Sequence, residues 1–140
     1  MKQRGFTLIE IMMVTAILAI LAAFAMASYQ NSVQKSRRAE AKTALMGAIN
    51  DFEVYYGRRN QYPGALSDIY SADTVDTETG LYELSILDTD GDGDTQEFEL
   101  QAEPKAGGRQ ADDPCGTFII NHLGAKDVDN TTGKTAEDCW

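Results

Sequence analysis

The hydrophobic and polar positions of the chain follow three successive patterns, and the first is a continuous apolar run. From Ile11 to Ala27 only Thr15 is polar, and the run lengthens to about 21 residues when Phe6 to Ile9 are included. This length suits a transmembrane helix, because it exceeds the apolar part of a secretory signal and is unusual for a buried helix in a small domain. We therefore expect a membrane-spanning segment at residues 6–29, which contains one acid, Glu10.

The second pattern is the stripe of an amphipathic helix over residues 30–56. Apolar residues recur at steps of three and four, and these are Ala41, Leu45, Ala48, Phe52 and Tyr55, with Ala44, Ile49 and Tyr56 alongside. The opposite side carries Arg38, Lys42, Asn50, Asp51 and Glu53. Gly57 and the polar residues after it supply a stop signal. The two patterns together predict one helix from Phe6 to Tyr56, whose first half a small domain cannot bury.

The third pattern has a period of two and predicts strands. Leu81–Leu87 and Glu97–Ala102 each place alternate apolar residues on one face, and Thr117–Ile120 is a third short apolar run, bounded by Gly116 and Gly124. We expect three or four antiparallel strands, with connecting loops at residues 57–80 and 103–114. The predicted class is α+β, in which the C-terminal half of the long helix packs on a three- or four-stranded antiparallel sheet.

Charge divides the chain into a basic part and an acidic part. Residues 1–59 hold eight Lys/Arg against four Asp/Glu, whereas residues 60–140 hold four Lys/Arg against eighteen Asp/Glu. This acidic half argues against nucleic acid as the main partner, because phosphates bind cationic surfaces. Lys2 and Arg4 precede the apolar run, and no further Lys/Arg follows until Lys35. The positive-inside rule then places the N-terminus in the cytoplasm and the acidic domain outside.

An acidic segment between the first two predicted strands matches the pattern D-x-D-x-D-G-x5-E of a calcium loop. The matching residues are Asp88, Asp90, Asp92, Gly93 and Glu99, and Asp94 would contribute its backbone carbonyl. Carboxylates at alternate positions can point at one ion, and the final Glu can close the site with both oxygens. The alternative is a solvated acidic turn, because the flanking segments are predicted to be strands rather than helices. Calcium is one of two interpretations of this segment.

The N-terminal residues Lys2-Gln3-Arg4-Gly5, followed by Phe6-Thr7-Leu8-Ile9-Glu10, resemble the class III prepilin signature of the type IV pilin superfamily. The resemblance implies that residues 1–5 are a leader and that a prepilin peptidase cuts after Gly5 and methylates the new amino group of Phe6. It also implies that Glu10 neutralises the N-terminal ammonium of a neighbouring subunit in a helical fibre. A buried carboxylate is tolerated only when it is paired. Many relatives carry proline where this chain has Ala27, so a continuous helix is expected here.

Further segments resemble the PilE-like minor pilins of this superfamily. They are Ser28–Asn31, Ser36–Ala41, Tyr55-Tyr56, Gln61–Pro63, Asp113–Thr117 and the closing Cys139-Trp140. The resemblance implies the pilin fold with a disulfide-bounded C-terminal loop. Cys115 and Cys139 both lie in the half expected outside the cytoplasm, where a structural disulfide is stable. The bridge would hold the loop from Gly124 to Asp138 on the sheet, with Trp140 as a packing residue beside it.

Three functions are compatible with these features. The first is a minor pilin that joins or primes a surface filament and supports motility or adhesion, and the second is a pseudopilin of a type II secretion system. The third is a pilus-borne DNA receptor. It ranks last because DNA binding relies on a basic surface, and the cations of residues 60–140 are only Lys105, Arg109, Lys126 and Lys134. An enzyme is not expected, because His122 is the sole histidine and the sequence has no nucleophile elbow, phosphate loop or His/Cys cluster.

These expectations also define domains, partners and location. Residues 6–29 would span the membrane and later the fibre core, and residues 30–140 would form the extracytoplasmic domain, with its helical half at 30–56 and its sheet and disulfide loop at 80–140. The expected partners are other pilin subunits, prepilin peptidase, the inner-membrane assembly platform and membrane lipid, with nucleic acid not expected. The protein would lie in the inner membrane with its domain in the periplasm before assembly, and in the extracellular pilus afterwards.

Overall fold

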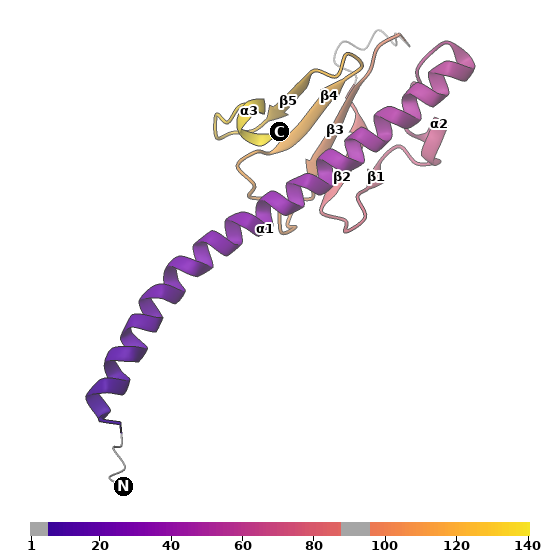
Figure 1. The fold of residues 1–140 in the computed structure, drawn as a ribbon. Coiled ribbons are helices and arrows are strands. Elements are labelled where there is room, and N and C mark those ends of the chain that lie inside the picture. The colour runs from indigo at the N-terminus through magenta and orange to yellow at the C-terminus, as the bar shows by residue number, and fades with distance from the viewer. Residues whose placement is uncertain (1–5, 88–95) are drawn as a thin grey trace. The chain divides into compact units, whose positions relative to one another are not determined.

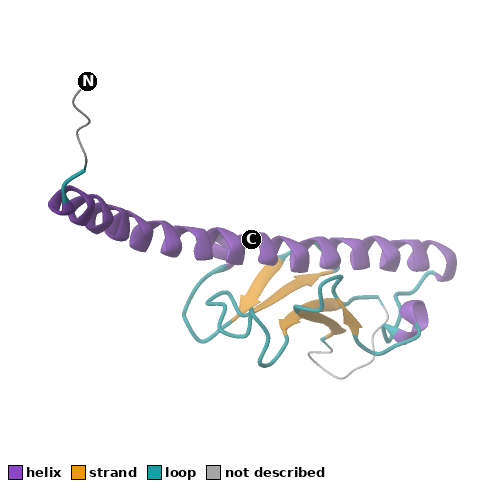
Figure 2. Ribbon diagram, turned by 90° about the horizontal axis from the view of Figure 1, so that it is seen from below, coloured by secondary structure: helices purple, strands orange, loops and turns teal. Residues whose placement is uncertain are grey.

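One long helix and a five-stranded sheet make up the structure. The computed structural model describes residues 6–87 and 96–140, and within these it contains α1 (Leu8–Arg59), α2 (Ser67–Tyr70) and α3 (Ala136–Cys139) beside the strands (Figure 1). The chain separates into two compact units, Met1–Lys35 and Ser36–Trp140. Within the second unit the sheet lies on one side of α1 (Figure 2).

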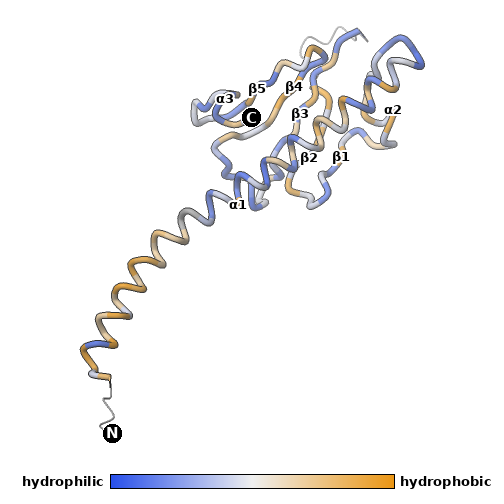
Figure 3. Tube along the Cα trace, in the orientation of Figure 1, coloured by the Kyte–Doolittle hydropathy of each residue, from blue (hydrophilic) through white to orange (hydrophobic). Residues whose placement is uncertain are grey.

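The first unit is an exposed apolar helix. The Thr7 hydroxyl accepts a hydrogen bond of 3.3 Å from the backbone N–H of Glu10, so Thr7 caps the helix, which begins at Leu8 rather than at Phe6. Apolar residues dominate this part of α1 (Figure 3), and their side chains remain outside any core: Leu8 is 78% exposed and Phe24 is 76% exposed. By length and composition α1 can cross a membrane, a test that an N-terminal signal sequence also passes.

α1 is unbroken from Leu8 to Arg59, as expected for a helix without proline at residue 27. The stop signal predicted at Gly57 is wrong. Asn60 instead takes the left-handed conformation with φ of 56°, and its N–H donates a hydrogen bond of 2.7 Å to the carbonyl of Tyr56. Asn tolerates this conformation, and the arginines of the last turn suit the negative end of the helix dipole, so the helix continues past the glycine.

The sheet is an antiparallel meander. Its strands lie in the order β1 (Val75–Asp76), β2 (Tyr82–Ile86), β3 (Glu99–Pro104), β4 (Thr117–Asn121) and β5 (Lys126–Asp129). The three predicted strands correspond to β2, β3 and β4, which confirms the α+β class and the antiparallel sheet. The expected number of three or four strands is wrong, because the part of the chain that the structure describes contains five.

β1 and β5 are short edge strands that the alternation of the sequence did not reveal. β1 has two residues and β5 has four, and most of their side chains are exposed, so neither shows an apolar period. β1 and α2 lie inside the loop expected at residues 57–80, and β3 extends to Pro104, into the second expected loop. These two edge strands are defined by their backbone pairing: β1 pairs with β2, and β5 pairs with β4.

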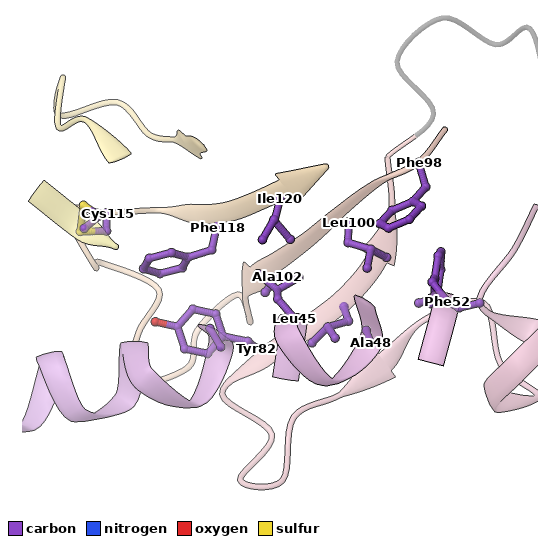
Figure 4. Packing of buried hydrophobic residues seen from close by; sticks show 14 residues of the cluster. Leu45, Ala48, Phe52, Tyr82, Phe98, Leu100, Ala102, Cys115, Phe118 and Ile120 are labelled. Carbon is purple, nitrogen blue, oxygen red and sulfur yellow. A yellow bond between two sulfur atoms is a disulfide. The ribbon is translucent and has the colours of Figure 1, made fainter. Parts of the chain in front are cut away.

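The core lies between the second half of α1 and one face of the sheet (Figure 4). The helix contributes Ala41, Leu45, Ala48 and Phe52, and the strands contribute Tyr82, Leu84, Leu100, Ala102, Phe118 and Ile120. Burying one large apolar side chain of this kind contributes about 1.5–3 kcal/mol. Tyr55, predicted on the same stripe, is only half-buried and lies outside this core, with its ring centroid 4.9 Å from the Arg59 guanidinium carbon.

Candidate functional site

The docking residues implied by the pilin resemblance lie on the exposed first unit. Phe6 is 80% exposed, Glu10 is also exposed, and Gly5 lies outside the described residues. Within residues 6–87 and 96–140, the Glu10 carboxylate forms neither an ion pair nor a hydrogen bond. The helix therefore presents an apolar surface and a carboxylate that pairs with none of the described residues.

A buried ion pair connects α1 to the loop before β4. Nε of Arg38 donates to the two carboxylate oxygens of Asp113 at 3.0 and 2.9 Å, and Nη2 lies 2.7 Å from Oδ1. The two side chains are 10% and 0% exposed. Arg38 was predicted to lie on the side of the helix opposite the apolar stripe, and that prediction is wrong: the residue is buried, because Asp113 supplies the opposite charge that a buried guanidinium requires.

Asp113 also organises a polar network inside the core. Gln110, which is 1% exposed, donates from Nε2 to Asp113 at 2.8 Å and to the Tyr82 hydroxyl at 2.9 Å, and the N–H of Cys115 donates to Asp113 at 2.9 Å. Burial raises the pKa of Tyr82 to about 12; the Gln110 hydrogen bond opposes this rise, and the nearby Asp113 charge adds to it. The network joins α1, β2 and the residues next to the disulfide, and no sequence period pointed to it.

Two acids of α1, Glu40 and Asp51, form hydrogen bonds with residues that follow the helix in the second unit. The Glu40 carboxylate accepts hydrogen bonds from the N–H of Thr79 at 3.0 Å and from its hydroxyl at 2.6 Å. Burial alone would raise the pKa of Glu40, but the hydrogen bonds from Thr77 and Thr79 outweigh it and lower the pKa. Asp51 accepts a hydrogen bond of 2.5 Å from Tyr70, which raises the pKa of Tyr70 together with burial, the larger cause. These two acids therefore attach α2 and the turn before β2 to α1.

The expected disulfide between Cys115 and Cys139 is present. Its Cα atoms lie 5.8 Å apart, and the two residues are 0% and 3% exposed. The bridge connects the start of β4 to α3, and the loop expected from Gly124 to Asp138 contains β5, which pairs with β4 and so belongs to the sheet. The C-terminal region is thus held both by a covalent bond and by a strand ladder.

Trp140 packs beside this bridge, in keeping with its predicted role. Its ring lies 5.6 Å from that of Phe118, and its indole N–H donates to the carbonyl of Asp127 at 2.9 Å. The ammonium of Lys42 donates to the Trp140 carbonyl at 2.9 Å, and that of Lys126 lies 5.0 Å from the indole centroid. These contacts fasten the last residue to α1 and β5.

The proposed calcium loop falls mostly outside the described residues, because Asp88, Asp90, Asp92 and Asp94 are not among them. Glu99 is described: it begins β3, lies opposite Asn121, and its carbonyl accepts a hydrogen bond of 2.8 Å from Leu87. Among residues 6–87 and 96–140, no group of three or more His, Cys, Asp or Glu is arranged to hold a metal. His122 follows β4 with its ring centroid 6.3 Å from that of Phe98.

The outer face of the sheet is acidic. Asp76 lies opposite Glu83, and Glu83 lies opposite Glu103, so three acids form a row across β1, β2 and β3. Like charges in such cross-strand pairs repel each other. Lys105 approaches this row and pairs with Asp76 at 2.7 Å. Among the described residues, this row carries three negative charges against the one positive charge of Lys105, which does not favour a phosphate backbone.

Comparison with known proteins adds two family profiles. The prokaryotic N-terminal methylation motif matches residues 1–26, and the family described as "Type IV minor pilin ComP, DNA uptake sequence receptor" matches residues 27–119. A type IV pilin from Shewanella oneidensis shares the fold with a TM-score of 0.51 at 23% identity, over 76% of this chain and 97% of that one.

Several curated relatives match this chain over about half of their length. Fimbrial protein EcpC of Eikenella corrodens is 38% identical over 85 residues, which cover 61% of this chain and 54% of that protein. A fimbrial protein of Moraxella nonliquefaciens is 40% identical over 57% of this chain and 51% of its own length. Type II secretion system core protein G of Pectobacterium carotovorum is 31% identical over 58% of this chain and 54% of its own length. The chain spans about half the length of these relatives.

An exposed apolar helix that continues into a helix-on-sheet domain with a C-terminal disulfide defines the pilin class. The chain belongs to the type IV pilins, in the minor pilin ComP family. That family's description includes DNA uptake, the function ranked last from the sequence.

Proposed function

We propose that this chain is a minor pilin that joins or primes a type IV pilus, with a structural rather than an enzymatic role. The observation that carries the proposal is the exposed apolar helix of a chain of this family, with an acid, Glu10, that pairs with none of the described residues. Packing the helix among sister helices removes apolar surface from water, at about 25 cal/mol per Å². Pairing Glu10 with the ammonium of a neighbouring Phe6 offsets the cost of burying that carboxylate.

Before assembly, the same helix would anchor the subunit in the inner membrane, with the N-terminus in the cytoplasm and the domain in the periplasm. A prepilin peptidase would cut after Gly5 and methylate Phe6, and an assembly platform would then move the subunit into the extracellular pilus. The match of residues 1–26 to the methylation motif and the apolar length of α1 support this sequence of events.

Immunogold labelling of sheared surface filaments tests the proposal. We expect gold along or at the tip of wild-type filaments and its loss with Glu10→Val. Thr15→Val is the matched control, because it also replaces a polar residue of the apolar run but removes no charge. Retained gold with Glu10→Val would contradict the docking role, and unlabelled wild-type filaments would contradict membership in the pilus.

A pseudopilin is the second candidate, supported by the similarity to the secretion core protein of Pectobacterium carotovorum. The two candidates differ in the phenotype of a deletion. Loss of protein export with intact filaments and motility would establish the pseudopilin, whereas a change in filament number or motility with normal export supports the pilin.

DNA reception is the third candidate, supported by the description of the matching family. The acidic row on the sheet opposes it, since DNA binding requires several cations along the phosphate backbone. We expect the full chain in detergent to bind duplex DNA weakly and without sequence preference, as measured by fluorescence anisotropy. A tight complex at physiological salt, with one sequence preferred to its scrambled version, would reverse this ranking.

A further inference from the structure

The side chain of Arg37 contacts the backbone of Arg109 at the end of the second unit where the chain enters it. Arg37 is the second residue of that unit and lies on α1, and Arg109 lies in the loop between β3 and β4. The guanidinium of Arg37 donates a hydrogen bond of 3.4 Å to the backbone carbonyl of Arg109. Neither side chain forms an ion pair with a residue in the ranges 6–87 and 96–140. The fold therefore places the Arg37 guanidinium against the backbone of Arg109, and no described acid forms an ion pair with either arginine.

The sequence keeps this pair close to the apolar run. Arg37 follows Ala27, the last residue of the run, by ten residues, and Lys35 is the one charged residue between them. Ten helical residues correspond to about 15 Å. A headgroup layer is about 5–8 Å thick, and the Debye length at physiological salt is about 8 Å. Tyr29, which is 68% exposed, has the position and chemistry of an interfacial aromatic residue.

Membrane insertion does not explain cations at this position. The positive-inside rule favours Lys and Arg on the cytoplasmic side, so an arginine such as Arg37, just beyond the apolar run on the outer side, opposes it. The unit as a whole is strongly acidic, because residues 36–140 contain nine Lys/Arg against twenty-one Asp/Glu. An anionic bilayer repels such a unit unless a cationic end faces the surface.

We infer that Arg37 and Arg109 bind the anionic headgroups of phospholipids at the surface of the membrane that anchors the helix. The inference rests on the proposed membrane anchor. Because the anchor keeps the arginines near the headgroups, the contact forms at an effective concentration of millimolar order, and two weak phosphate contacts are enough. DNA in solution has no such tether and needs more cations to bind, so the headgroup surface is the better fit. The contact holds the acidic unit in a defined orientation before assembly.

Energy transfer from Trp140, the sole tryptophan, can report this contact. Trp140 contacts α1 near this end of the unit, because its carbonyl accepts a hydrogen bond of 2.9 Å from Lys42, five residues after Arg37. The full chain is reconstituted into vesicles that carry a dansyl headgroup lipid, with phosphatidylcholine alone or mixed with phosphatidylglycerol. We expect more transfer in the anionic vesicles, and loss of the excess near 1 M salt, where the Debye length is about 3 Å.

Two double variants separate this site from a general charge effect. Arg37→Gln with Arg109→Gln is expected to remove the excess transfer, since each arginine near an anionic surface changes the docked population about fivefold. Arg58→Gln with Arg59→Gln removes the same charge at the other end of the helix and is expected to retain it. Circular dichroism confirms that both variants fold. Equal transfer in the two lipids, or equal loss in both variants, would overturn the inference.

Competition distinguishes the sources of phosphate. If inorganic phosphate abolishes the excess transfer at an ionic strength where chloride does not, the site binds a soluble phosphate and the headgroup assignment is overturned. If short duplex DNA abolishes it, the assignment is overturned in favour of a nucleic acid. Vesicle flotation tests the anchor separately. A chain that floats with neither lipid contradicts the proposed function as well, whereas one that floats with both but shows no lipid-dependent transfer contradicts this inference alone.

Discussion

At the residue scale, Arg38 and Asp113 are the most interdependent side chains of the second unit. Both are buried, and their closest atoms lie 2.7 Å apart. Removing two charges from water is costly, and the pair recovers this cost only because Gln110 and the N–H of Cys115 satisfy further lone pairs of Asp113. The pair therefore fixes the position of the loop before β4 more than it adds to net stability.

Asp113→Ala leaves the Arg38 guanidinium buried without a partner, and we expect a loss of about 3–5 kcal/mol in the free energy of unfolding. Asp112→Ala is the matched control, because Asp112 is exposed and adjacent. Thermal melting of the full chain in detergent micelles measures both. The double variant Arg38→Met with Asp113→Leu should recover most of the loss, and a double variant as unstable as Asp113→Ala would contradict this account.

Tyr82 makes the stability of the fold sensitive to alkali. Its pKa is raised to about 12 in the folded state, above the ordinary value near 10. The unfolded chain therefore releases this proton first, and the free energy of unfolding falls as pH rises from about 10 to about 12. Tyr82→Phe should make this fall less steep, as measured by denaturant unfolding at several pH values. An unchanged pH slope would show that Tyr82 does not cause it.

At the scale of elements, the turn into β4 depends on a glycine. Gly116 has φ of +60°, and a Cβ there would collide with the carbonyl of Asp129, where β5 ends. Gly124 has φ of +75° but open space around it, so it serves as a control. We expect Gly124→Ala to cost about 1 kcal/mol from backbone strain and Gly116→Ala distinctly more, as measured by thermal melting. Equal losses would show that the close approach is unimportant.

The acidic segment before β3 yields a metal prediction at the same scale. If Asp88, Asp90, Asp92 and Asp94 bind calcium together with Glu99, millimolar calcium raises the melting temperature by several degrees, because a ligand at about 100 times its Kd adds about 2.7 kcal/mol. Glu99→Gln should abolish the rise, and Glu97→Gln should preserve it. A melting temperature that calcium does not change would favour the solvated acidic turn.

At the scale of the whole molecule, the first unit is expected to anchor the chain, and the second unit contains the described hydrophobic core. Every residue of the hydrophobic core lies between Ala41 and Trp140, inside the second unit. We expect a chain that begins at Tyr29 to be soluble and monomeric without detergent, with the melting temperature of the full chain in micelles. A chain that begins at Ala39 lacks Arg38 as well and should melt at a lower temperature. A Tyr29 chain without cooperative melting would contradict this division.

Much of the candidate site could be predicted from short local signals. The apolar run with Glu10 and the two cysteines are visible in the sequence, because their chemistry does not depend on the rest of the fold. The Arg38–Asp113 pair was not visible, since a charge on a helix is usually solvated and its partner lies 75 residues away. The contact of Arg37 with Arg109 was missed for the same reason, because only the fold brings α1 and the loop before β4 together.

By itself, the sequence determined the long helix, the three central strands and the class of the fold. The second half of α1, β2 and β3 each bury one face, which imposes a period on their residues, and the first half of α1 and β4 are continuous apolar runs. The tertiary structure alone decided where α1 ends, which edge strands join the sheet, and which charges are buried. β1 and β5 are short and largely exposed, so their backbone pairing and not their side chains defines them. The same holds for Arg38 and Tyr82, whose environment comes from residues distant in the chain.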